Sequence, residues 1–163
     1  MNQPDKPLVE RRTLRHALGE FATGVAVVTA RRADGRPVGV TINSFTSVSL
    51  EPPLVLWSLG LQSSSLAIFE ACGHFAINVL ANDQIELSQG FSQSLDDPFA
   101  GIDLEVGACG TPMLPGCCAW FECRNEMRYP GGDHMIFVGQ VENFRRQEKS
   151  ALIFHRGRYR SLP

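Results

Sequence analysis

Short runs of β-branched residues separated by turn signals constrain the fold of this chain more than any other feature. Residues 24–30 and 37–42 are both rich in valine and threonine, and the dipeptide Asp34-Gly35 lies between them. An Asp-Gly dipeptide between two such runs is typical of a β-hairpin. Further runs with strand character follow at 45–49, 54–59, 75–80 and 151–155. This spacing predicts an antiparallel fold in which turns join consecutive strands.

Two longer segments also have strand character. Residues 117–128 alternate between apolar and charged side chains, which predicts a strand with one buried side and one solvent-facing side. The buried side would carry Cys117, Ala119, Phe121 and Cys123, and the solvent-facing side Glu122, Arg124, Glu126 and Arg128. Residues 133–144 are apolar on both sides, as in a barrel wall that faces a partner subunit. We therefore expect about six or seven strands in all.

The expected helices are short. Leu14, Leu18 and Phe21 recur at helical spacing within residues 13–21. This spacing predicts an amphipathic helix that covers one end of the core. The serines at positions 63–65 could cap a second helix that follows them directly.

The middle of the chain contains a third helix and a long irregular segment. The helix is expected at residues 82–91, with Asn82 or Asp83 as its N-cap. Residues 92–116 are rich in proline and glycine. We expect them to form an irregular excursion that serves as a lid or a dimer arm.

Composition places the chain among ordinary folded proteins. It has 163 residues, 44% of them hydrophobic and 20% charged, which favours a single domain over residues 11–163. We expect residues 1–10 to form a disordered tail. The net charge of -2, without a long basic run, argues against nucleic-acid partners. No stretch resembles a membrane span or a signal peptide, so the expected location is the cytoplasm.

The five cysteines lack the paired Cys-x-x-Cys spacing of a zinc site or a redox dithiol. In a reducing compartment they are interpreted as small apolar residues buried in the core. A metal cluster is the alternative, and on spacing alone we expect no metal site. The five are Cys72, Cys109, Cys117, Cys118 and Cys123.

The polar stretch at residues 41–49 is the most unusual part of the sequence. The residues that would share one face of a continuous strand are Thr41, Asn43, Phe45, Ser47 and Ser49. Most of them are small and polar, which is unusual for a core strand. Such a face, beside exposed backbone amides, could form a platform for a planar heterocycle rich in donors and acceptors. The alternative is a solvent-facing strand with serine and threonine pairs, and the residues alone leave both open.

Two further features could contact a ligand. The helix start at Ser63–Ser65 could bind a phosphate through its backbone amides, although serines there are more often only caps. His134 follows a glycine turn and could contact a ligand at the mouth of a strand, or it could be a structural histidine. The sequence contains no dinucleotide-binding glycine motif, no phosphate loop and no motif of a hydrolytic enzyme.

Several segments, taken in order, carry a resemblance that covers nearly the whole chain. They are Phe21-Ala22-Thr23-Gly24-Val25, Val28-Thr29, Thr41 to Ser49, Pro52-Pro53, Phe75 to Leu80, Gly132-Asp133-His134 and Gly157-Arg158-Tyr159. Together they resemble the flavin reductase-like family. Its best-known members are the small reductase components of two-component flavin-dependent monooxygenases.

The resemblance implies a mainly β fold with short flanking helices, a Greek-key split β-barrel of the FMN-binding type. Such barrels form homodimers with one flavin per subunit near the interface. The residues implied to contact the isoalloxazine ring and the ribityl chain are Thr41, Ile42, Asn43, Ser44, Ser47, Val48 and Ser49. The residues implied to lie near the phosphate are Ser58, Gln62, Ser63, Ser64 and Ser65. Some relatives have a lysine or arginine in this last segment, and this chain departs from them there.

The resemblance also implies roles for four other residues. Phe91 matches a phenylalanine that lies close to the flavin, and the position equally fits the last apolar residue of a short helix. His134 matches the histidine of the family's Gly-Asp-His motif, where the nicotinamide nucleotide docks. Arg158 and Tyr159 match positions near the flavin edge.

The implied activity is that of an NAD(P)H:flavin oxidoreductase. Hydride would pass from NADH or NADPH to FMN or FAD, and the reduced flavin would diffuse to a partner monooxygenase. No basic cluster indicates a 2′-phosphate pocket, so NADH is favoured over NADPH. One alternative is a flavoprotein that keeps its flavin and reduces a corrinoid or a ferric complex. The other is a non-catalytic flavin-binding protein.

Overall fold

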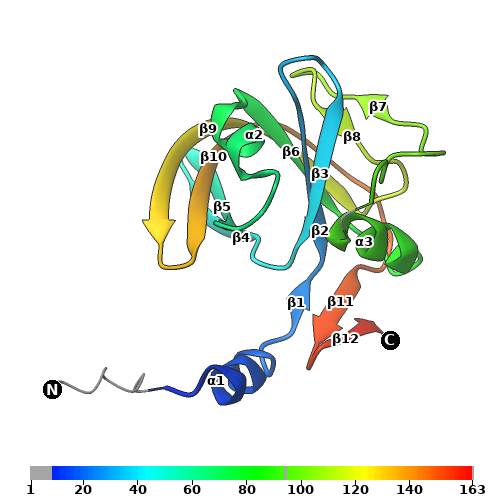
Figure 1. Cartoon of the computed structure of the whole chain (residues 1–163). Helices are drawn as coiled ribbons and strands as arrows, with labels where there is room; N and C mark the ends of the chain where they lie inside the picture. Colours follow the sequence, from blue (N-terminus) through cyan, green and yellow to red (C-terminus); the bar gives the residue numbers. More distant parts are fainter. Residues whose placement is uncertain (1–8, 94, 163) are drawn as a thin grey trace, which may run out of the picture.

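The computed structural model describes residues 9–93 and 95–162, so most of the tail expected at 1–10 lies outside the described residues. Strands dominate and short helices flank them (Figure 1). The helices are α1 (Arg11–Leu18), α2 (Leu66–Ala71) and α3 (Ile85–Ser92). The strands are β1 (Thr23–Gly24), β2 (Ala26–Arg31), β3 (Pro37–Ile42), β4 (Thr46–Leu50), β5 (Pro53–Gly60), β6 (His74–Val79), β7 (Glu105–Val106), β8 (Pro112–Met113), β9 (Ala119–Gly131), β10 (His134–Arg146), β11 (Leu152–His155) and β12 (Arg158–Ser161). None of the described helices is long and apolar enough to cross a bilayer.

Seven strands form one antiparallel sheet in the order β3-β2-β6-β9-β10-β5-β4. The strands β3 and β4 follow each other along the chain, yet they lie at opposite edges of this sheet. In a flat sheet those edges would stand roughly 29 Å apart, because neighbouring strands are about 4.8 Å apart. The chain from Ile42 to Thr46 can span at most about 14 Å. The sheet must therefore curl into a barrel, and Figure 1 shows this curvature.

The barrel is split, because no ladder of backbone hydrogen bonds joins β3 to β4 within the described residues. The mainly β split barrel with short flanking helices expected from the sequence is thus confirmed. The predicted hairpin is present, with Val28 opposite Val40. A smaller sheet of β1, β11 and β12 lies beside the barrel, next to α1 (Figure 1).

An aromatic cluster fills the barrel. Trp57 of β5 stacks on Phe137 of β10 with ring centroids 4.5 Å apart, and Phe69 of α2 and Phe75 of β6 contact Trp57 edge-on. All four side chains are fully buried. Burial of aromatic side chains of this size contributes on the order of 2–3 kcal/mol each. The helix α2 therefore closes the barrel by inserting Phe69.

A second core covers the outer surface of the sheet. Adjacent residues of a strand point to opposite sides, so Val28 faces the barrel interior and Val27 packs in this outer core. The excursion at 92–116 supplies much of the cover, including Leu114. Buried Asn78 holds the excursion against the sheet. The Oδ1 atom of Asn78 accepts a hydrogen bond from Leu114 N, and its Nδ2 atom donates to Val27 O. The excursion is largely irregular as expected, and its described residues form only one short strand pair, β7 and β8.

The first helix differs from its predicted role. The segment is helical, but α1 has no buried residue and covers no part of the core. Leu18 is 66% exposed and Phe21, just beyond the helix, is 78% exposed. The amphipathic spacing is real, but no described residue buries these side chains.

The predicted N-cap is confirmed for α2 and wrong for α3. Ser65 is the N-cap residue of α2, but its side chain makes no capping hydrogen bond. Ser63 instead accepts a hydrogen bond from Ser65 N, 3.3 Å away. The N-cap of α3 is Gln84 instead of Asn82 or Asp83, and its side chain bonds to Ala81 N and Pro115 O. The start of α2 is therefore held by local bonds to Ser63, and the start of α3 also by the long-range bond from Gln84 to Pro115.

The alternation predicted for 117–128 is only partly correct. Cys117 precedes β9 and packs in the outer core, whereas Cys123 packs in the barrel. Glu122, expected in solvent, is only 2% exposed. Its carboxylate accepts hydrogen bonds from Ala108 N, Cys109 N, Thr111 Oγ1 and Asn143 Nδ2. Burial opposes ionisation of Glu122, but these hydrogen bonds outweigh it and lower the pKa of the carboxyl.

The cysteines are free thiols, as expected. Cys117, Cys118 and Cys123 are buried. Burial raises the pKa of Cys117 and of Cys123 to about 12. Cys72 and Cys109 are only half-buried, so the prediction of core cysteines holds for three of the five.

Gly139 permits the close packing of the barrel interior. A Cβ at this position would lie 2.5 Å from Phe75 Cζ and 2.8 Å from Cys123 Cβ. We expect Gly139→Ala to lower the free energy of unfolding by about 1–3 kcal/mol, the usual cost of overpacking a core. Denaturant unfolding monitored by tryptophan fluorescence measures this loss.

Gly73→Ala is the matched control, because nothing lies within 4 Å of a Cβ built at Gly73. This control should unfold at nearly the wild-type denaturant concentration. Equal stability of both variants would show that the interior can relax around an added methyl group.

Candidate functional site

The edge strand β4 carries the polar stretch that the sequence singles out. As the last strand of the seven-stranded sheet, β4 directs one row of backbone N–H and C=O groups away from its partner β5. The register shifts between Ser47 and Ser49, so the intervening Val48 forms a bulge, and its side chain is 50% exposed. Exposed backbone groups beside small hydroxyls offer both donors and acceptors to a flat, polar ring system.

The separate runs expected at 37–42 and 45–49 are present as β3 and β4, so the single strand face considered for residues 41–49 is wrong. The chain bends at residues 43–45, between β3 and β4, where it crosses the split of the barrel. Thr41 and Ser47 therefore belong to different strands and do not share one strand face. Ile42 is 7% exposed and packs inside the barrel, so only its backbone is available to a ligand. Asn43 is exposed.

Ser44 connects the bend to β5. Its hydroxyl accepts a hydrogen bond from Ser58 N, 3.0 Å away, and lies 3.2 Å from Ser58 O, to which it donates. The predicted ring-binding residue and the predicted phosphate-side residue are thus in direct contact. This contact fixes the bend against the strand that also pairs with β4.

Thr41 lies at the other end of the bend and contacts α3. Its hydroxyl donates to Ser88 O at 2.7 Å. Ser88 Oγ lies 2.8 Å from the hydroxyl of Tyr159 on β12. Tyr159 is therefore linked to Thr41 through α3. Arg158 is exposed, and no hydrogen bond or ion pair links its side chain to the other site residues within the described chain.

His134 lies at the start of β10, directly opposite Gly60 at the end of β5. Its side chain is 48% exposed, so His134 is not a core residue. Nδ1 of His134 is 2.6 Å from Asp133 Oδ1, and this hydrogen bond lowers the pKa of the Asp133 carboxyl. Because Asp133 is ionised near neutral pH, Nδ1 is the donor in this pair and Nε2 is left as the other ring atom for a ligand.

A groove of about 970 Å³ contains the segment at 62–65 together with Phe91. Phe91 is 4% exposed and packs edge-on against Phe99, with ring centroids 4.7 Å apart. The position is therefore a core position, as one of the two sequence interpretations states, and it also lines the groove. The volume is in the range of small-molecule sites.

Two arginines in this groove were not predicted from the sequence. Arg32 and Arg36 flank the β2–β3 turn and line the same groove as Gln62 and the three serines. Arg36 pairs with Asp34 at 2.7 Å. Asp96 and Asp97 line the groove as well, so its charge is mixed. No local sequence signal brings a hairpin turn beside residues 62–65, because only the tertiary fold does so.

The predicted residues thus form a connected group around the split of the barrel. Ser44 contacts Ser58, and Ser58 lies on the strand whose end pairs with His134. The segment at 62–65 follows that same strand end, where Leu61 N donates to Asp133 O. Thr41 and Tyr159 are linked to each other through Ser88, and within the described residues the side chains of Asn43 and Arg158 make no hydrogen bond to these residues.

Comparisons with known proteins extend this description. The family described as "Flavin reductase like domain" matches residues 18–163. The FMN reductase (NADH) SmoA of Agrobacterium fabrum is 45% identical over 148 residues, which cover 91% of this chain and 84% of SmoA. The reductase component of the flavin-dependent trigonelline monooxygenase of Acinetobacter baylyi is 43% identical over 91% of this chain. The chain spans only 48% of that relative, and it spans about half the length of another curated relative it matches.

Solved structures give the same result. The NADH:FAD oxidoreductase SgcE6 of Streptomyces globisporus, in complex with NAD and FAD fragments, superposes with a TM-score of 0.90. It is 38% identical, and the match covers 94% of this chain and 93% of SgcE6. The fold, the order of the motifs and these similarities lead to one conclusion. The chain belongs to the flavin reductase-like family.

Proposed function

We propose that this protein is an NAD(P)H-dependent flavin reductase, with FMN or FAD along the exposed edge at β4 and the nicotinamide beside His134. One observation carries the proposal. Ser58, which is hydrogen-bonded to Ser44, and Gly60, which pairs with His134, lie on the same strand, β5. Residues 58 and 60 are about 7 Å apart along a strand, so a flavin at one and a nicotinamide at the other can approach closely.

The side chains at this edge fit the flavin as a ligand. The outward backbone groups of β4 and the hydroxyls of Ser47 and Ser49 match the donors and acceptors of an isoalloxazine edge. The bound flavin and nicotinamide supply the hydride transfer themselves, so no side-chain nucleophile is required. The protein provides position and hydrogen bonds, which is consistent with a site made of small polar residues.

His134 would position the nicotinamide nucleotide. Asp133 accepts a hydrogen bond from Nδ1 and so holds the imidazole in one orientation. Gly60 lies across from the ring, and a Cβ built there would be 3.9 Å from His134 Nε2. The glycine thus keeps space free beside the nitrogen that faces a ligand.

Arg32 and Arg36 would supply the positive charge that the segment Gln62–Ser65 lacks. The two guanidinium groups line the groove with that segment, where the resemblance implies the flavin phosphate. Arginine binds phosphate oxygens through charge-assisted hydrogen bonds. On this proposal the neighbouring hairpin, chiefly through Arg32, would compensate for the departure from the family at residues 62–65.

The reduced flavin would leave for a partner monooxygenase. Relatives named as reductase components of such enzymes support this assignment. We place the reaction in the cytoplasm, because the cysteines are free and a reducing compartment keeps them so.

The activity is tested by steady-state oxidation of NADH and NADPH, each with FMN, FAD and riboflavin. We expect oxidation that depends on added flavin and is faster with NADH. Anaerobic mixing with NADH then separates the alternatives, since a flavin-binding protein without activity leaves its bound flavin oxidised. Absence of turnover in all six combinations of nucleotide and flavin would refute the proposal.

His134→Ala should raise the KM for NADH about fivefold, the factor that corresponds to loss of one hydrogen bond of ~1 kcal/mol. The Kd for flavin, measured by fluorescence quenching, should stay near the wild-type value. His16→Ala is the control, because His16 is exposed on α1. If His134→Ala raised the KM for NADH and the Kd for flavin by the same factor, the nicotinamide nucleotide would not bind beside His134.

Arg32→Ala should weaken FMN but not riboflavin, since only FMN carries a phosphate. Loss of one charge-assisted hydrogen bond predicts a five- to tenfold rise in the Kd for FMN, or about 1–1.4 kcal/mol. Arg146→Ala, at the exposed end of β10, is the control. If both flavins lost the same affinity, Arg32 would not be a phosphate ligand.

We further propose that the protein is a homodimer. Leu14, Leu18 and Phe21 on and beside α1 are 45%, 66% and 78% exposed, and Phe144 of β10 is 69% exposed. Exposed apolar side chains in this number favour a protein interface. A second copy that covers α1 would also give this helix the apolar contacts that one subunit lacks.

The double variant Leu18→Ser/Phe21→Ser should shift the protein from dimer to monomer in size-exclusion chromatography with light scattering. Ala67→Ser, exposed on α2, should remain dimeric. A wild-type protein that elutes as a monomer, or a double variant that stays dimeric, would contradict this interface.

A further inference from the structure

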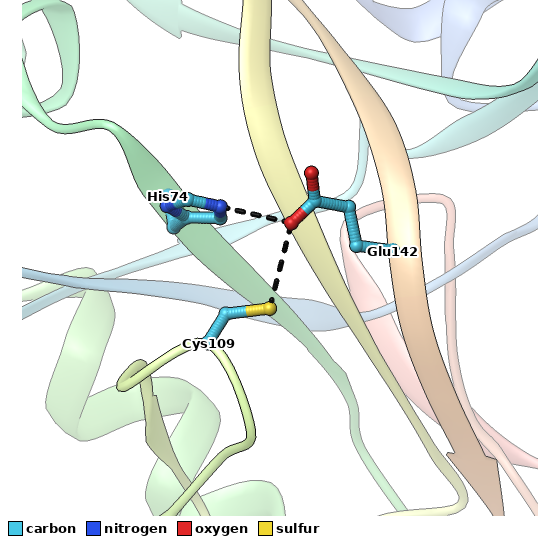
Figure 2. Close-up of side chains that lie close together, drawn as sticks. All are labelled: His74, Cys109 and Glu142. Atoms are coloured by element: carbon cyan, nitrogen blue, oxygen red, sulfur yellow. Dashed lines mark hydrogen bonds and ion pairs between the residues drawn. The ribbon is translucent and has the colours of Figure 1, made fainter.

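Three side chains from distant parts of the chain converge beside β9 (Figure 2). His74 begins β6, Glu142 lies on β10 and Cys109 lies in the loop between β7 and β8. His74 Nε2 is 2.9 Å from Glu142 Oε2, and Cys109 Sγ is 3.6 Å from the same oxygen. One donor atom from each residue lies within 4.8 Å of the other two.

The position of Cys109 is fixed by a buried group. The carboxylate of Glu122 accepts a hydrogen bond from Cys109 N at 2.9 Å and from Ala108 N at 3.0 Å. A Cβ at Gly107 would collide with this carboxylate, so the glycine allows the loop to lie directly on it. The backbone that carries the Cys109 thiol is therefore anchored to the sheet through Glu122.

Glu142 is also oriented. Its Oε1 accepts a hydrogen bond from Arg124 Nη1 at 3.2 Å, and this leaves Oε2 directed at His74 and Cys109. Arg124 is itself held by Glu126 and by Gln140. The side chains of His74 and Glu142 are 37% and 31% exposed, so an ion from solvent can reach them.

We propose that His74, Cys109 and Glu142 form a binding site for a divalent transition-metal ion, best suited to Zn²⁺. Imidazole, thiolate and carboxylate are the three donor types that zinc uses, and three protein ligands leave a fourth position for water. Tetrahedral bonds of about 2.0–2.3 Å need donor atoms about 3.3–3.8 Å apart, so small side-chain rotations complete the site.

Metal binding here is a ligand exchange without redox change. The Cys109 S–H bond breaks, a bond from sulfur to the metal forms, and the proton passes to solvent buffer. Burial and the nearby carboxylates of Glu122 and Glu142 raise the pKa of Cys109, so the metal-free site holds a thiol.

The site is separate from the proposed flavin chemistry. Glu142 lies eight residues beyond His134 on the same strand, roughly 25 Å along β10. A bound ion would crosslink the β7–β8 loop to two strands of the main sheet. Its consequence is therefore stability of that loop, and its test does not rely on flavin reduction.

Titration with Co²⁺, which substitutes for Zn²⁺ and reports its ligands, tests the site. Difference spectra of the full-length protein, with thiols kept reduced, should show one Co²⁺ per chain, a sulfur-to-cobalt charge-transfer band in the near ultraviolet and visible bands of tetrahedral cobalt. Added Zn²⁺ should remove these bands. Cys109→Ser should abolish the charge-transfer band, and His74→Gln or Glu142→Gln should weaken Co²⁺ binding at least about tenfold.

Cys72→Ser is the matched control, because Cys72 is also half-buried but lies against Asn125 instead. It should keep the Co²⁺ spectrum. Zn²⁺ should raise the Tm of the wild type and of Cys72→Ser but leave that of Cys109→Ser unchanged, which distinguishes loss of the site from loss of folding. A wild type without saturable Co²⁺ bands, or a Cys109→Ser variant that keeps the charge-transfer band, would overturn the proposal.

Discussion

Closure of the seven-stranded sheet by a very short link is the constraint on which the rest of this structure depends. The chain between Ile42 and Thr46 connects the two outermost strands, so the sheet must curl until its edges approach. The two edges do not pair with each other. One row of backbone N–H and C=O groups on β4 is consequently available to bind a ligand. The same residues that close the barrel therefore create an exposed row of donors and acceptors. Ser44 stabilises the closure through Ser58, which couples the shape of the barrel to the geometry of the site.

A curled sheet of this length needs apolar residues on both of its surfaces. The interior takes the aromatic cluster around Trp57, and the outer surface takes residues such as Val27 and Trp120. The irregular excursion covers this outer surface, and it must satisfy its backbone groups without regular pairing. Buried Asn78 and Glu122 perform this function, since each binds backbone N–H groups of the covering loops. The buried Glu122 carboxylate thus has a structural role, because it satisfies backbone N–H groups of the irregular loop.

Local sequence patterns predicted what depends on local structure. The hairpin, the strand at 75–80 and the irregular excursion follow from β-branched runs, turn residues and proline content, and each is present. The burial of Glu122 and the place of Arg32 in the groove were not predicted. Each depends on a contact between segments far apart in sequence, which periodicity does not report. The polar face at 41–49 was visible from the residues alone, but only the family resemblance assigned a flavin to it.

The strand β10 explains how one small domain can hold two unrelated sites. His134 begins the strand at the open side of the barrel, and Glu142 lies on the half that runs beyond β5, where the β7–β8 loop crosses the sheet. Between them, Phe137 anchors the strand in the barrel core, and Gly139 packs against Phe75 and Cys123. The proposed ion at Glu142 would act on the β7–β8 loop, roughly 25 Å along the strand from His134, and so would stabilise the cover of the outer core and not the proposed nucleotide site.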